Sequence, residues 1–134
     1  MSYRYYIDHN LSCCFVEHSG HYHGAEAANQ YMELIQKKEL SKQLHIIRYL
    51  NHVESADLLD SDNALMALRN RQFERQVMWT GFDVIILEKN NASYENLHKR
   101  FKQASRHFFN IKIFDNEYDA RQFLEIPSDY VVNF

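Results

Sequence analysis

The most constraining feature of the chain is a short, uninterrupted apolar run, Val-Ile-Ile-Leu, that follows Asp83. Residues 83–87 are too few for a typical helix, and their β-branched side chains favour a strand. A strand without alternation of polar and apolar residues is buried on both faces, as in a parallel sheet covered by helices. The run therefore predicts an α/β protein built around a central sheet.

The rest of the chain alternates between strand-like and helix-like patterns. Short segments rich in aromatic and β-branched residues predict further strands over residues 3–7, 11–17, 44–50 and 111–114. Apolar residues at helical spacing predict helices over residues 25–38, about 61–77 and 93–108. A last helix is expected between its capping residue Asn116 and Pro127. The order β-β-α-β-α-β-α-β-α predicts a mixed sheet of about five strands with an opening hairpin and right-handed crossovers.

Length and composition indicate a single domain over residues 1–134. Only three Gly and one Pro occur, too few for a disordered chain or a glycine-rich nucleotide site. The formal net charge of −3 gives no general reason to expect nucleic acid as a partner. No run approaches the roughly 18 apolar residues that span a bilayer, and the first residues do not resemble a signal peptide, so we expect a cytoplasmic protein.

No motif in the sequence nominates a catalytic centre. Gly-x-Ser-x-Gly, His-Glu-x-x-His, a P-loop and Cys-x-x-Cys are all absent. Cys13 lies within an apolar strand pattern, where a thiol is usually inert. Neighbouring side chains of a strand point to opposite faces, so Cys13 and Cys14 are not expected to form a disulfide. We therefore expect a binding protein without a cofactor rather than an enzyme.

Burial is expected to be nearly complete at Val84, Ile86, Leu97 and Phe101, which lie in the apolar strand and on the apolar face of the helix after it. Trp79 and the apolar tail of residues 130–134 are read as additions to the core rather than as an exposed patch.

Three local phrases carry a resemblance to a known family. They are a strand that ends in Ser19-Gly20 before an Ala/Glu-rich helix, the buried DVIIL strand, and the closing phrase IKIFDNEYDARQFL. Together with the order of elements, they resemble the STAS superfamily, specifically its SpoIIAA-like (anti-sigma-factor-antagonist-like) branch, over roughly residues 3–124. The resemblance implies a STAS-like domain that acts as a regulatory protein-interaction module.

One position departs from the family pattern. In typical members, the third strand leads to an Asp-Ser-Ser-Gly turn, and a partner kinase phosphorylates its second Ser. The matching stretch here is Asp60-Ser61-Asp62-Asn63, so Asp62 stands where the phosphorylated Ser would be. The resemblance therefore implies a module without the usual serine phosphorylation switch.

The partner surface is expected on the strand-to-helix region of residues 54–63 and on the helix that adjoins it. Loops that follow parallel strands meet at one edge of the sheet, where binding residues gather, and most connections need only about four to six residues. The simpler interpretation of the acidic residues is helix capping. The partner is expected to be a protein of unknown identity, with a homodimer left open. The candidate residues are Glu54, Ser55, Asp57, Asp60, Ser61, Asp62 and Asn63.

The alternative function is a small carrier or sensor. Such a protein would hold a lipophilic or aromatic ligand in an apolar cleft between the sheet and the helices. The nine Tyr and nine Phe suit a carrier and an interaction module equally, so they do not separate the two.

Three histidines, His18, His21 and His23, are weak candidates for metal ligands. Imidazole is the commonest metal ligand, and Glu17 offers a fourth. His21 and His23 would share a face only if the chain were extended there. The simpler interpretation is a solvated, histidine-rich turn, so no bound metal is expected.

Overall fold

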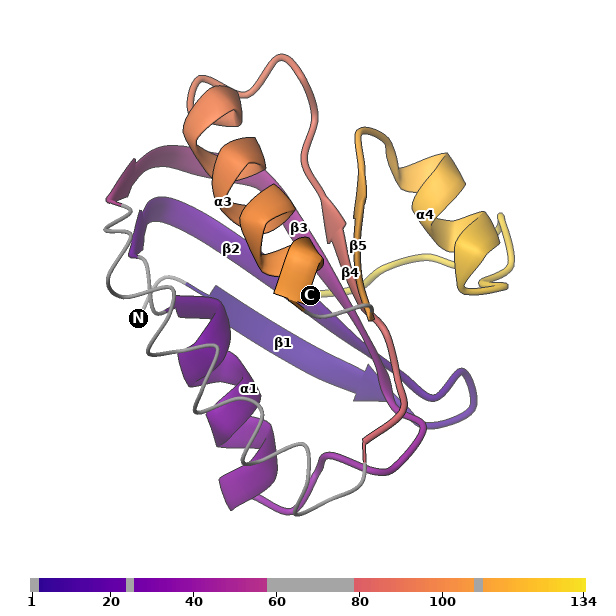
Figure 1. Cartoon of the computed structure of the whole chain (residues 1–134). Coiled ribbons are helices and arrows are strands. Elements are labelled where there is room, and N and C mark those ends of the chain that lie inside the picture. The colour runs from indigo at the N-terminus through magenta and orange to yellow at the C-terminus, as the bar shows by residue number, and fades with distance from the viewer. Residues whose placement is uncertain (1–2, 24–25, 58–78, 108–109) are drawn as a thin grey trace.

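The computed structural model describes residues 3–23, 26–57, 79–107 and 110–134 (Figure 1). Five strands form one mixed sheet in sequential order, and β1 pairs antiparallel to β2 while the other neighbours are parallel. The α/β class and the mixed five-stranded sheet are confirmed. The strands are β1 (Tyr3–Asp8), β2 (Cys13–His23), β3 (His45–Asp57), β4 (Asp83–Ile86) and β5 (Ile111–Phe114). The described helices are α1 (Glu26–Gln36), α3 (Tyr94–His107) and α4 (Glu117–Phe123).

The two faces of the sheet are covered by different parts of the chain. Right-handed crossovers that always step in the same direction place their helices on one face, and α1 and α3 share that face (Figure 1). The opposite face is covered by α4 and the C-terminal tail, in which Tyr130, Val132 and Phe134 pack on the core while Val131 is exposed. The tail therefore completes the second layer, as its apolar composition predicts.

The apolar run at residues 84–87 is buried on both faces. Val84 and Ile86 join the cluster beneath α4, whereas Ile85 and Leu87 join the cluster beneath α3. Leu97, Phe101 and Trp79 are buried as well. The core expected from the sequence is therefore confirmed.

The last helix begins where the sequence places it. The side chain of Asn116 accepts a hydrogen bond from the backbone N–H of Asp119 at 2.8 Å, which caps α4. In the described segments, no helix is both long enough and apolar enough to cross a membrane.

Two strands run further than the sequence predicts. We expected β2 to end before a turn at Ser19-Gly20 and β3 to end at Leu50, but they pair in parallel as far as His23 and Asp57. Register shifts between residues 17 and 19 and between 20 and 21 disturb the alternation by which a strand is recognised. The expected polar connection is thus strand up to Asp57, and the expected helix over residues 61–77 lies outside the described residues.

Candidate functional site

The ends of β2 and β3 project beyond the rest of the sheet. Strand β4 pairs only with the segment Ile46 to Tyr49 of β3, whereas the β2–β3 pairing continues to Asp57. We call residues 19–23 of β2 and 52–57 of β3 the β2–β3 extension. It is the structural feature on which the candidate site is built.

The β2–β3 extension has one packed face and one exposed face. Tyr22, Val53 and Ala56 join the cluster beneath α3, and the ring of Tyr22 meets that of Phe101 edge-on, with centroids 6.0 Å apart. On the other face, the cluster beneath α4 includes no described residue of β3 beyond Tyr49. The outer side chains of the extension are therefore held by a buried layer and still reach solvent.

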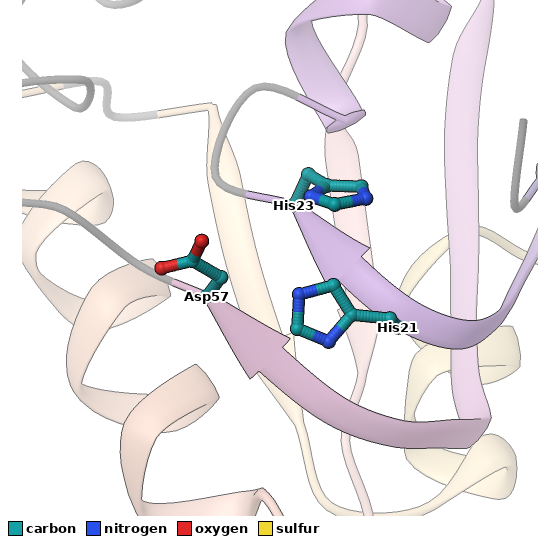
Figure 2. A group of neighbouring side chains, drawn as sticks. All are labelled: His21, His23 and Asp57. Atoms are coloured by element: carbon teal, nitrogen blue, oxygen red, sulfur yellow. The ribbon is translucent and has the colours of Figure 1, made fainter.

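Three exposed side chains gather on that outer face: His21, His23 and Asp57 (Figure 2). The register pairs His23 with Asp57 and His21 with Ser55, so side chains from two neighbouring strands stand side by side. One nitrogen from each imidazole and one oxygen from the carboxylate lie within 4.8 Å of one another. The rings of the two histidines meet edge-on at a centroid distance of 4.7 Å.

Ser55 fixes the ring of His21. Its Oγ lies 2.6 Å from His21 Nδ1, a hydrogen bond between opposed residues of the two strands. The chain reaches this geometry after the register shift at Gly20, which has a φ of +69°. A residue in the left-handed region is typical of a bulge, and glycine adopts that conformation without steric cost.

His18 lies apart from the other two histidines. Its side chain is fully buried, with Nδ1 2.8 Å from Glu26 Oε1 and Nε2 3.2 Å from Nη1 of Arg48. A guanidinium can only donate, so Nε2 accepts and Nδ1 carries the proton that His18 donates to Glu26. Burial lowers the pKa of His18, although its hydrogen bond with Glu26 opposes that shift, and the positive charge of Arg48 adds to the lowering. His18 is therefore a neutral, structural side chain.

The expected partner surface is described only in part. Glu54, Ser55 and Asp57 are exposed positions of β3, on a strand rather than in the expected loop. Asp60, Ser61, Asp62 and Asn63 lie outside the described residues. What the sequence does not reveal is that Asp57 lies beside His21 and His23, because that proximity depends on the pairing of two strands separated by a helix.

The two cysteine thiols are enclosed in the core. Cys13 and Cys14 are free thiols with almost no exposed surface, and their neighbouring positions on β2 place them in clusters on opposite faces of the sheet. Burial raises the pKa of Cys14 to about 12 and raises that of Cys13 as well. The reactive form of cysteine is the thiolate, so both thiols are held in their unreactive form, and Sγ of Cys14 accepts a hydrogen bond from Nε2 of Gln30 at 3.8 Å.

No protein-family model matches this chain, and no curated protein is similar enough to match it. The resemblance to the SpoIIAA-like branch of the STAS superfamily therefore remains a prediction from the sequence.

Proposed function

We propose that this protein is a non-catalytic interaction module and that the exposed face of the β2–β3 extension is its contact surface for a protein partner. The observation that carries the proposal is the projection of two paired strands beyond the covered part of the sheet. Such a surface combines exposed polar groups with a buried backing, the arrangement by which rigid scaffolds present binding residues.

The chemistry of the surface indicates what it would bind. Glu54 and Asp57 supply carboxylates, and Ser55 supplies a hydroxyl. The imidazoles of His21 and His23 add groups that donate or accept hydrogen bonds. A partner that presents basic side chains or N–H donors would be complementary to this set.

The burial of the described thiols and of the His18 imidazole supports binding over catalysis. The two described thiols, Cys13 and Cys14, are buried and protonated. The buried imidazole of His18 is already engaged with Glu26 and Arg48. These groups stabilise the core and do not face a substrate.

The packing also favours an interaction module over a carrier of apolar ligands. Both faces of the sheet are lined by clusters of buried side chains that meet α1, α3, α4 and the tail. A carrier needs an enclosed apolar space, and in the described layers that space is occupied by the protein's own side chains. The described elements follow the order on which the resemblance to the regulatory STAS family rests, apart from the helix expected over residues 61–77, which lies outside the described residues.

Site-specific photo-crosslinking in the native host tests the proposal. Glu54 is replaced by benzoylphenylalanine, and the matched control carries the same replacement at Val131, which is 78% exposed on the tail. We expect a discrete crosslinked partner from position 54 that is absent from position 131 and weakened several-fold by Asp57→Ala. A product of twice the chain mass would identify a second copy of the protein as that partner.

Two results would contradict the proposal. One is the same set of crosslinked products from positions 54 and 131, which would mean that the extension has no special role. The other is a product from position 54 that Asp57→Ala leaves unchanged in a variant shown by circular dichroism to be folded.

A further inference from the structure

We infer that His21, His23 and Asp57 form a binding site for a Zn²⁺ ion on the exposed face of the β2–β3 extension. This inference goes beyond the proposed interaction, because it concerns the protein alone and does not require a partner.

The ligand types are those that zinc prefers. Two imidazole nitrogens and one carboxylate oxygen suit Zn²⁺, whereas Mg²⁺ and Ca²⁺ favour sites made of oxygen alone. All three side chains are exposed, so an ion can reach them from solvent. Three protein ligands leave a fourth tetrahedral position for water.

The distances require only a small adjustment. The three ligand atoms lie within 4.8 Å of one another. With metal–ligand bonds of about 2.0–2.2 Å, tetrahedral ligands stand roughly 3.4 Å apart. To bind one ion, the ligand atoms must therefore approach one another by on the order of 1.4 Å. Rotation of exposed side chains can supply this movement without displacing the strands.

The strand pairing brings the ligands together before any ion binds. His21 and His23 are two residues apart on β2, and Asp57 is directly opposite His23 on β3. Asp57 is far from the histidines in sequence, and the entropy of closing the intervening chain is already spent in forming the β2–β3 ladder. Binding then has to order only three side chains.

Ser55 gives the site an outer hydrogen bond of the kind that zinc sites use. Histidines that bind metal usually donate their other ring N–H to a nearby acceptor, which orients the ring. His21 Nδ1 is 2.6 Å from Ser55 Oγ, so zinc on Nε2 would select the tautomer in which Nδ1–H donates to Ser55. Ser55 is therefore a positioning residue of this site.

Calorimetric titration of the full chain with ZnCl₂ in a non-chelating buffer tests the inference. We expect saturable binding of one ion per chain, and no saturable heat from MgCl₂ under the same conditions. His23→Gln and Asp57→Asn should each weaken zinc binding at least tenfold. Ser55→Ala should weaken it by roughly tenfold or more, the range known for outer-shell partners.

A neighbouring histidine provides the matched control. The side chain of His52 is 69% exposed on β3, outside the three-residue group, so His52→Gln should leave zinc binding unchanged. The inference is overturned if the wild type shows no saturable zinc binding, or if folded His23→Gln and Asp57→Asn variants bind zinc as tightly as the wild type. Crosslinking and calorimetry are independent, so failure of one proposal is distinguishable from failure of the other.

Discussion

Arg48 on β3 holds Asp83 on β4 in a two-pronged ion pair, with Nε 2.9 Å from Oδ1 and Nη2 3.1 Å from Oδ2. Arg48 is only 1% exposed, and its other terminal nitrogen donates to Nε2 of His18 on β2. One side chain thus links three neighbouring strands. Because the guanidinium is planar and always charged, it fixes the direction of each of these contacts.

Asp83→Ala should lower the free energy of unfolding by about 3 kcal/mol, because it leaves a buried guanidinium without its main counter-charge. Urea denaturation measures the loss. The control is Arg4→Ala, which breaks the ion pair with Glu17 at the edge strand, where Arg4 is 63% exposed. That change should cost less than about 1 kcal/mol. Equal losses in the free energy of unfolding from the two variants would show that the buried ion pair stabilises the fold no more than the exposed one.

Stability should fall as the pH drops below about 6.5, and His18 should be one cause. In the unfolded chain a histidine has a pKa of about 6.5, whereas burial lowers the pKa of His18 in the folded protein. Between the two values the unfolded chain binds a proton that the folded protein excludes, so acid favours unfolding. Above the higher value both states are neutral and the effect vanishes.

Urea denaturation between pH 7.5 and 5 measures this dependence. His18→Gln should flatten this pH dependence. The slope that remains in His18→Gln is expected to come partly from His45, whose pKa is also lowered by burial. If the free energy of unfolding of a folded His18→Gln variant depended on pH as strongly as that of the wild type, His18 would not be a cause of the acid sensitivity.

Phe101→Ala should lower the free energy of unfolding by roughly 3–5 kcal/mol, the usual cost of removing a buried aromatic ring. Phe101 is 6% exposed and backs the β2–β3 extension through its edge-on contact with Tyr22. Phe123, which is 40% exposed on α4, provides a matched control with a smaller expected loss. Equal losses from the two variants in urea denaturation would mean that the ring of Phe101 carries no special share of the core.

The elements that could be predicted from sequence are those with an undisturbed local pattern. The run at residues 84–87 is uniformly apolar because both faces of the sheet are covered there, and α3 shows regular helical spacing because only one of its faces meets the sheet. Asn116 indicates the start of α4, because its own side chain caps the helix. In each case the physical cause lies within a few residues.

The β2–β3 extension could not be predicted in the same way. Two register shifts interrupt the alternation of inward and outward side chains along its strands. Gly20 adopts a left-handed conformation, and a glycine at such a position is typical of a turn in the sequence. The approach of Asp57 to His23 depends on pairing between strands that are distant in sequence. A pattern within one segment carries no information about that register, so the histidines look like a solvated turn.

Gly20 and Gly81 should respond differently to substitution, because the first is limited by its backbone conformation and the second by the atoms around it. A Cβ on Gly81 would overlap the carbonyl group of Leu44, approaching its carbon to 2.8 Å, and would lie 2.5 Å from Nε1 of Trp79. That nitrogen donates to Leu44 O at 2.6 Å, so the crowded atoms are held in place. We expect Gly81→Ala to cost about 1–3 kcal/mol, as overpacking does, and Gly81→Asn to cost more.

Gly20 is limited by its backbone conformation and not by space. Its φ is +69°, yet a Cβ there would meet no atom within 4 Å. Gly20→Ala should therefore cost roughly 1–2 kcal/mol, the penalty of an ordinary residue in the left-handed region. Asn tolerates that region better than Ala, so Gly20→Asn should recover part of the loss. Urea denaturation of the four glycine variants measures these losses in the free energy of unfolding. If Asn lowers the free energy of unfolding more than Ala does at both positions, the bulge at Gly20 does not require a left-handed residue.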